Sequence, residues 1–153
     1  MSTNDELKHF NFDQLSPEQI NKAREIERIC FDDPWSESLW QHYLPQTFAL
    51  FASDQLLAYA QCSIVLNEAE LLRIAVDPSH RRKGIGKQVM MALLNLLKDQ
   101  GTERLMLEVR ASNKAAIALY ATSGLSLEGR RKGYYETEQA GQREDALLMG
   151  VNL

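Results

Sequence analysis

The sequence has few cysteines and no cluster of metal-binding residues. Cys30 and Cys62 are its two cysteines, and neither has a partner at the spacing of a zinc site or a redox motif. The three histidines, His9, His42 and His80, also lack ligand spacing. We therefore expect two buried or inert thiols, no disulfide and no metal site.

Long apolar runs, repeats and linkers are also missing. No stretch approaches the roughly 18 apolar residues of a membrane span. The opening residues MSTNDELKHF do not place a basic segment before an apolar one. No tract rich in Pro, Gly or Ser divides the 153 residues. We expect one soluble, cytoplasmic domain over residues 1–153, with residues 1–9 as a loose lead-in.

Positive charge is scarce, because 17 Lys and Arg stand against 21 Asp and Glu, for a net charge of -4. This balance argues against a protein that binds nucleic acid with its whole surface, so any anion site must be local. One alternative stays open. Arg130, Arg131 and Lys132 with Tyr134 and Tyr135 could form an RNA patch, with cations on phosphates and aromatic rings on bases.

Strand and helix signals alternate along the chain. Ser16, Pro17 and Gln19 form a capping box that predicts a helix to about Arg28, and Ser36 can cap a second helix through Tyr43. Further helices are expected at 84–100 and 113–122, and strands at 10–14, 47–52, 57–66, 70–76, 105–109, 125–130 and 146–151. The order β-α-α-β-β-β-α-β-α-β-β predicts an α/β or α+β fold with a mixed sheet flanked by helices.

The strand predicted at 70–76 leads into a basic, glycine-containing turn. The strand is a nearly continuous apolar run, which is typical of a strand buried on both faces. The turn reads HRRKGIGK, with cations and then two glycines at a helix start, where free N–H groups can hold a phosphate. A Walker loop would need Ser or Thr in place of Gln88, and a dinucleotide fingerprint would need Gly or Ala in place of Val89. A solvated basic turn is the alternative.

The stretch LEVRASNKAAIALYATSG, residues 107–124, contains a carboxylate and a phenol in unusual places. Glu108 falls on the opposite face of its strand from three apolar residues, Leu105, Leu107 and Val109. Tyr120 lies near the end of a helix that Ser112 or Asn113 can cap and Gly124 can stop. Taken alone, Glu108 could lie on a wet face and Tyr120 in the core.

These segments together resemble a known family. Arg81-Arg82-Lys83-Gly84-Ile85-Gly86 matches the Arg/Gln-x-x-Gly-x-Gly/Ala turn of the GCN5-related N-acetyltransferases, and LLRIAVDPSHRRKGIGKQVM resembles that family's strand-turn-helix for coenzyme A. LEVRASNKAAIALYATSGL and GYYETEQAGQREDALLMG resemble the branch that acetylates the N-terminal alanine of a small-subunit ribosomal protein. With FDDPWSESLW, the resemblance runs from about Phe31 to the C-terminus. The segment ETEQAGQ, residues 136–142, is longer than expected for that branch.

The resemblance implies a mostly antiparallel sheet and a direct transfer of acetyl from acetyl-coenzyme A to an amine, without a metal. It assigns Glu108 as general base and Tyr120 as general acid. An α-amine of pKa about 7.7 to 8.0 loses its proton at pH 7 for roughly 1 kcal/mol, against nearly 5 for lysine, so a carboxylate suits it better. The implied cofactor-binding residues are Ile74, Ala75, Val76, Arg81, Arg82, Lys83, Gly84, Ile85, Gly86, Lys87 and Asn113.

The implied acceptor is a protein with a free N-terminal alanine, most simply a ribosomal protein, with no membrane and no direct nucleic-acid role. Asp32, Asp33 and Glu37 would suit a basic tail on such a protein, or they form a solvated helix entry. A small-molecule amine is the alternative acceptor. It would be favoured by a closed acceptor pocket rather than an open groove.

Overall fold

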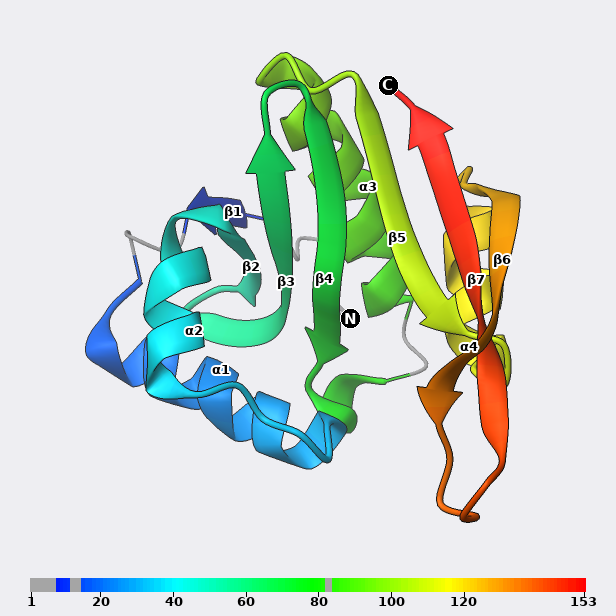
Figure 1. Cartoon of the computed structure of the whole chain (residues 1–153). Coiled ribbons are helices and arrows are strands. Elements are labelled where there is room, and N and C mark those ends of the chain that lie inside the picture. Colours follow the sequence, from blue (N-terminus) through cyan, green and yellow to red (C-terminus); the bar gives the residue numbers. More distant parts are fainter. Residues whose placement is uncertain (1–7, 12–14, 82–83) are drawn as a thin grey trace.

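The computed structural model describes residues 8–11, 15–81 and 84–153. In these residues the chain forms one mixed sheet with helices on both faces (Figure 1). The helices are α1 (Pro17–Cys30), α2 (Glu37–Tyr43), α3 (Ile85–Asp99) and α4 (Lys114–Thr122), with short 3-10 helices η2 (Leu44–Gln46) and η3 (Pro78–His80). The strands are β1 (Lys8–Asn11), β2 (Thr47–Ala52), β3 (Gln55–Val65), β4 (Glu68–Val76), β5 (Arg104–Arg110), β6 (Ser126–Glu136) and β7 (Arg143–Asn152).

The predicted order of elements is confirmed, and the sheet order is β1-β2-β3-β4-β5-β7-β6. Among the described strands, β4 and β5 pair in parallel and the other neighbours pair antiparallel. The first strand begins earlier than predicted, so Lys8 and His9 belong to β1 rather than to a lead-in. Residues 1–7 and 12–14 of the predicted lead-in and strand lie outside the described residues.

Local sequence signals account for the helix ends. Ser16 accepts a hydrogen bond from the Gln19 N–H while the Gln19 side chain accepts from the Ser16 N–H, so the predicted capping box is present. The side chains of Ser36 and Asn113 cap α2 and α4 by accepting hydrogen bonds from the Leu39 and Ala116 N–H groups. The apolar stripe predicted for α3 is buried along its length, at Ile85, Val89, Leu93 and Leu97.

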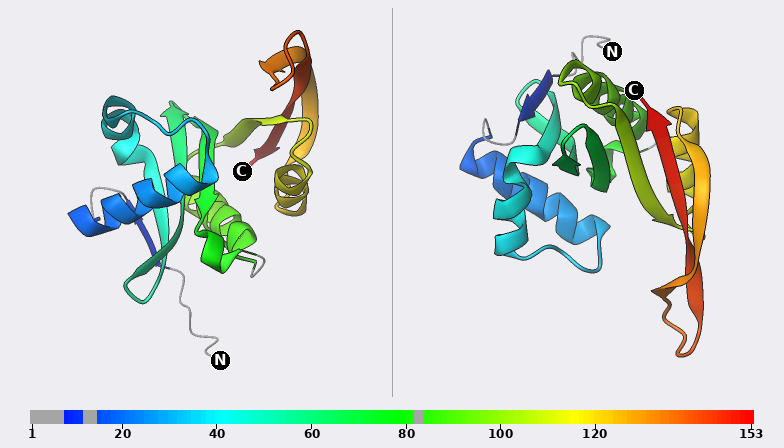
Figure 2. Two further views of the ribbon diagram at one scale, coloured as in Figure 1. Left: turned by 90° about the horizontal axis from the view of Figure 1, so that it is seen from below. Right: turned by 45° about the horizontal axis from the view of Figure 1, so that its top comes forward.

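Two apolar cores lie on opposite faces of the sheet. One lies between the sheet and the pair α3 and α4, and the other lies between α1, α2 and the strands β2 to β4. Figure 2 shows α1 and α2 on the same side of the sheet as the tip of the β6–β7 hairpin, with α3 on the other side. The side bearing α1, α2 and the hairpin tip is called the front face below.

The prediction that β4 is buried on both faces is wrong. Ala69, Leu71 and Ala75 are buried, whereas Ile74 and Val76 are only half-buried and Glu70 is exposed. The register between β3 and β4 shifts at Leu72, because Cys62 pairs with Leu71 and Gln61 with Arg73. This bulge exchanges the two faces of β4, so that Arg73 and Ala75 point toward α1 and α2.

The β4–β5 gap, the space between Leu71–Val76 and Leu107–Arg110, leaves one edge of β4 open. The two strands pair only from Glu68 with Arg104 to Glu70 with Met106, and beyond those residues they diverge (Figure 1). A strand without a neighbour exposes backbone N–H and C=O groups. The gap therefore explains why this half of β4 is less buried than its apolar sequence predicts.

The β6–β7 hairpin is longer than the sequence predicted. Pairing continues through Tyr135 with Glu144 and Glu136 with Arg143, well past the predicted strands at 125–130 and 146–151. The charged run in β6 hides the alternation by which a strand is recognised. The hairpin projects beyond the rest of the sheet and places the predicted long segment, 136–142, at its tip (Figure 1).

Candidate active site

A groove of about 400 Å³ opens beside the β4–β5 gap. It brings together β4, α4, the end of α1 and the turn before α3. Its lining contains six of the predicted site residues, Ile74, Ala75, Val76, Arg81, Asn113 and Tyr120, together with Cys30, Phe31, Ala115, Ala116 and Leu119. Cys30 and Phe31 were not predicted from the sequence, because they come from a helix end more than 40 residues earlier in the chain.

Backbone groups of β4 face this groove. The Asp77 N–H donates to the Leu57 carbonyl at 2.8 Å, which fixes the side on which the backbone of Asp77 and Ala75 pairs with β3. Because successive residues of a strand direct their backbone groups to opposite sides, the N–H and C=O of Ile74 and Val76 point away from β3, to the open edge of β4. The Cys30 thiol, 3.5 Å from the Val76 carbonyl, confirms that direction. Ala75 lies in the α1 and α2 core through its side chain.

The start of α3 is open to an anion. Gly84 has a φ of +74°, which a residue with a side chain rarely adopts, and it gives the helix no side-chain cap. The first N–H bonded within the helix is that of Gln88, to the Gly84 carbonyl at 3.1 Å, so the N–H groups of Ile85, Gly86 and Lys87 have no intrahelical acceptor. The Ile85 side chain is buried, and Lys87 is exposed. Arg82 and Lys83 lie outside the described residues.

Helix α4 presents Asn113 and Tyr120 to the same groove. Asn113 accepts a hydrogen bond from the Ala116 N–H through its side-chain oxygen, so its amide nitrogen is available for another contact. The Tyr120 ring is buried, and burial raises the pKa of its phenol to about 12. Its hydroxyl makes no hydrogen bond to any residue in the described part of the chain. Tyr120 is therefore a neutral donor at the groove, without a partner among the described residues.

Glu108 lies on the other face of β5. It lines a front-face cavity of about 240 Å³ with Glu70, Met106 and Arg131. The Arg131 Nε lies 3.0 Å from the Glu108 Oε1. Burial, and after it the Glu108 carboxylate, raise the pKa of Tyr135, which places that carboxylate near the hairpin. The structure thus separates the two predicted catalytic residues, with the Tyr120 ring on the α3 and α4 side of the sheet and Glu108 on the front face.

A second front-face cavity lies at the hairpin tip. It has a volume of about 560 Å³ and four carboxylates in its lining, those of Asp32, Glu136, Glu138 and Glu144, against one cation, Arg110, which pairs with Glu144 at 2.8 Å. We call it the acidic cavity. Asp32 comes from the segment between α1 and α2, so the cavity joins the two ends of the front face. Sequence reasoning noted Asp32 and the 136–142 segment but did not bring them together, because the length of the hairpin was not predicted.

Several of the charged residues considered from the sequence form ion pairs, which affects the roles they can have. Of the three acidic residues predicted to suit a basic tail, Asp33 pairs with Arg73 and Glu37 with Arg24, which leaves Asp32 at the acidic cavity. In the predicted RNA patch, Arg130 pairs with Asp145 and Arg131 with Glu108. Two of its three cations are therefore already compensated by carboxylates, which weakens that alternative.

Two general features of the described residues complete the site. They contain no helix long and apolar enough to cross a membrane. Within 8–11, 15–81 and 84–153, no three His, Cys, Asp or Glu residues are grouped as a metal site would require. Cys30 and Cys62 are both free thiols, and burial raises the pKa of Cys62 to about 12.

Fold and motif together define the class of the protein. Residues 18–125 match the acetyltransferase (GNAT) family. The chain belongs to this family and is an N-acetyltransferase. It is 39% identical over 142 residues to the [ribosomal protein bS18]-alanine N-acetyltransferase of Salmonella typhimurium, a match that covers 90% of this chain and 93% of that protein. The corresponding Escherichia coli K12 enzyme is 38% identical with the same coverage.

Solved structures agree with this assignment. The crystal structure of the ribosomal-protein-S18-alanine N-acetyltransferase from Escherichia coli superposes with a TM-score of 0.81 at 35% identity, and covers 95% of this chain and 93% of that chain. A Bacillus subtilis acetyltransferase in complex with CoA has a TM-score of 0.76 at 20% identity over 97% of this chain and 99% of that chain. The second likeness supports the fold alone.

Proposed function

We propose that the enzyme moves an acetyl group from acetyl-coenzyme A to the α-amine of an N-terminal alanine, and that ribosomal protein bS18 is the acceptor. The names of the relatives support this substrate. The observation that carries the proposal is the β4–β5 gap, which has a free tyrosine hydroxyl at the groove behind it and a carboxylate in the cavity before it. We also propose that residues 1–153 form a single acetyltransferase domain that works in the cytoplasm.

The groove fits acetyl-coenzyme A without a metal. The N–H groups of Ile85, Gly86 and Lys87, which have no acceptor within α3, suit the pyrophosphate together with Arg81 at the turn, and Arg82 and Lys83 would add charge. Ile74 and Val76 suit the pantetheine amides through their backbone, while Ala75 contributes packing on the front side. Asn113 suits a further polar contact. CoA bound to the Bacillus subtilis neighbour of the same fold supports the choice of ligand.

Two residues divide the proton transfers between them. When bound, acetyl-coenzyme A supplies an acetyl group activated as a thioester. Glu108 takes a proton from the α-ammonium, either directly or through a water, and its place in the front cavity suits an amine that arrives from that side. Tyr120 gives its proton to the leaving sulfur. With a pKa of about 12 it holds that proton throughout the physiological range.

The acceptor side suits a chain rather than a small amine. It presents two cavities, one at Glu108 and one at the hairpin tip, instead of one closed pocket. A peptide whose amine reaches Glu108 could place later residues near the acidic cavity. Asp32 and Glu138 would then favour basic side chains there, whereas Glu144 already pairs with Arg110 and Glu136 with Arg143.

Turnover of peptides tests the proposal. The peptides differ only in their first residue, share a basic tail with an internal lysine, and are compared with Nα-blocked versions and with free polyamines. The Ala-starting peptide should have the highest kcat/KM, and its blocked form should not react. Equal turnover of the blocked peptide would show that lysine is the acceptor, and faster turnover of a polyamine would show a small-molecule enzyme.

A further inference from the structure

Arg73 connects the strand of the groove to the segment between α1 and α2. It lies on β4 directly after the bulge and directly before Ile74. Only 9% of its side chain is exposed. Its guanidinium donates to the Glu27 Oε2 at 3.2 Å and to the Asp33 carbonyl at 2.7 Å, and it lies 3.1 Å from the Asp33 Oδ1. One side chain thus bonds both to a helix and to the segment that follows it.

Glu27 is the buried anchor of these contacts. It is 1% exposed, and its carboxylate accepts hydrogen bonds from the Trp35 N–H at 2.9 Å and from the Trp40 indole at 3.0 Å, in addition to Arg73. A buried carboxylate needs such donors, because desolvation of an unpaired charge costs several kcal/mol. The pair of Glu27 and Arg73 therefore joins α1, α2 and β4 at one point.

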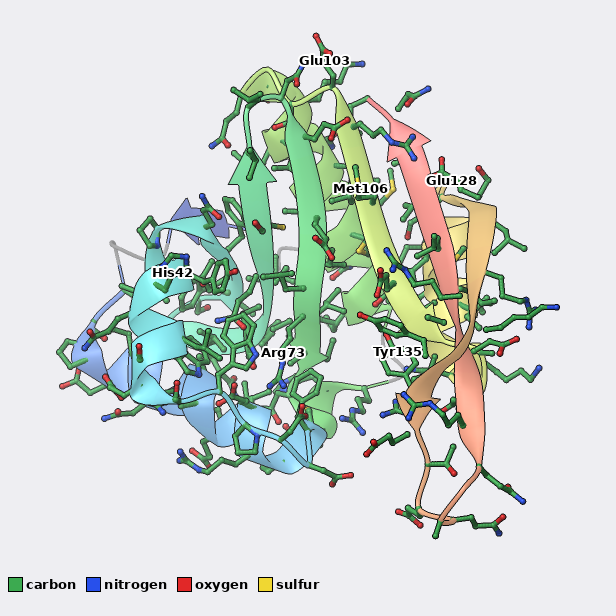
Figure 3. All side chains as sticks on the ribbon, viewed as in Figure 1. His42, Arg73, Glu103, Met106, Glu128 and Tyr135 are labelled. Carbon is green, nitrogen blue, oxygen red and sulfur yellow. The ribbon has the colours of Figure 1, made fainter. Side chains whose placement is uncertain are left out.

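The segment 31–35 is held at alternate residues. The Arg73 guanidinium lies 4.3 Å from the centre of the Phe31 ring and 5.2 Å from that of Trp35, and it bonds to Asp33 between them. Phe31 lines the groove, and Asp32 lines the acidic cavity. Segment 31–35 is therefore the wall where the groove meets the acceptor side. Figure 3 shows Arg73 on the α1 side of the gap and Tyr135 on the hairpin side.

We propose that Arg73 is a positioning residue for the acceptor. By fixing Phe31, Asp33 and Trp35 it holds Asp32 at the acidic cavity, and so it sets the affinity for the acceptor without touching the groove's ligand. The inference rests on the proposed function. It extends that function by naming the residue that shapes one wall of the acceptor site.

The shape of the arginine side chain is essential to this role. A guanidinium is planar, donates in several directions at once and stacks on aromatic rings, whereas an ammonium is a point charge. Lysine at position 73 would still compensate Glu27, so the fold would keep its buried ion pair. It would lose the bond to the Asp33 carbonyl and the stacking on Phe31 and Trp35.

The substitution Arg73→Lys tests the proposal, with Arg28→Lys as the matched control. Arg28 is the residue after Glu27 in α1, but its side chain is exposed. In Arg73→Lys the KM for an Ala-starting peptide should rise about tenfold, a loss of about 1.4 kcal/mol in binding, while kcat and the affinity for coenzyme A stay near wild type. Hydrogen exchange of segment 31–35 should become faster. Arg28→Lys should match wild type in all four measurements.

The possible results separate the two proposals. An unchanged KM would overturn the role of Arg73, whether or not segment 31–35 exchanges faster. An equal loss of coenzyme A affinity would assign Arg73 to the groove instead. A wild-type enzyme that acetylates no peptide would contradict the proposed function, which the role of Arg73 requires.

A double variant covers the case in which Arg73→Lys is unstable. Glu27→Gln with Arg73→Gln removes both charges together, so neither is left buried and unpaired. The rise in KM should be the same as in Arg73→Lys, because the contacts to segment 31–35 are lost in both. A folded double variant with a wild-type KM would also overturn the proposal.

Discussion

The two sides of the β4–β5 gap present different kinds of chemical groups. Behind the sheet, the proposed cofactor site uses backbone groups of β4 and of the start of α3, beside side chains of α4 and the end of α1. In front of it, two separate ion pairs join distant segments, Glu108 with Arg131 and Arg73 with Asp33, the neighbour of Asp32. A site of backbone groups tolerates change in most side chains, whereas a site of paired side chains does not. The rear side should therefore depend on few residues and the front side on many.

The largest expected effect is on the rear side, at the glycines of the turn. Gly84→Glu or Gly86→Glu should abolish coenzyme A binding in calorimetry, because a carboxylate would stand where the helix N–H groups should meet a pyrophosphate. Gly101→Glu is the matched control. Gly101 also has a positive φ, of +88°, and free space around it, so it shares the backbone strain of Gly84 but lies at the far end of α3. If Gly101→Glu lost as much affinity for coenzyme A, backbone strain rather than the position of the carboxylate would explain the effect.

Tyr120→Phe should have the next largest effect. It keeps the buried ring and removes only the hydroxyl that donates the proton, so kcat should fall by about 100-fold or more at every pH tested. Coenzyme A affinity and the melting temperature should change little. A large drop in melting temperature with retained turnover would show instead that Tyr120 is only a core residue.

Glu108→Gln tests the front side. Near pH 7 turnover of an Ala-starting peptide should fall about 100-fold, with unchanged cofactor affinity. The difference in activation free energy between Glu108→Gln and wild type should decrease by about 1.36 kcal/mol per pH unit up to the amine's pKa of about 8, because free solution then supplies the neutral amine. Glu70→Gln, in the same cavity on β4, is the control and should remain close to wild type. A mutant as active as wild type at pH 7 would exclude Glu108 as the base.

The smallest expected effect concerns stability at high pH. Burial raises the pKa of Tyr120 from 10.0 to about 12. Its contribution to the free energy of unfolding is therefore complete below pH 10 and is lost as the pH rises through 12. Between pH 9 and pH 11, wild type should lose about 1.4 kcal/mol more unfolding free energy than Tyr120→Phe. Urea titrations measure this difference. Tyr134→Phe, at an exposed ring, should lose as much as wild type.

Local signals predicted most of the fold and the rear side. The Ser16 and Ser36 caps, the stripe of α3 and the glycine turn each act within a few residues, so a sequence shows them directly. The bulge at Leu72 was not predicted, because it depends on the register between two strands. The buried pair of Glu27 and Arg73 was missed for a similar reason. Its members are 46 residues apart and carry no motif.

The front side was predicted only in part. Glu108 was identified through the family resemblance, but its partner Arg131 was considered only as part of the alternative RNA patch. The length of the hairpin, and with it the acidic cavity, was hidden by a charged strand that lacks clear alternation. Charge in a sequence shows where ion pairs are possible, and the fold decides which of them form.

The separation of Tyr120 and Glu108 by the sheet has a consequence for inhibitor design. If coenzyme A binds in the groove and the peptide at Glu108, as proposed, a bisubstrate compound that joins them must carry its linker through the β4–β5 gap. The coenzyme A half would use the backbone N–H and C=O groups of β4 and of the start of α3, which depend little on side-chain identity. Selectivity for this enzyme would have to come from the peptide half, through the carboxylates of the acidic cavity and the segment that Arg73 holds.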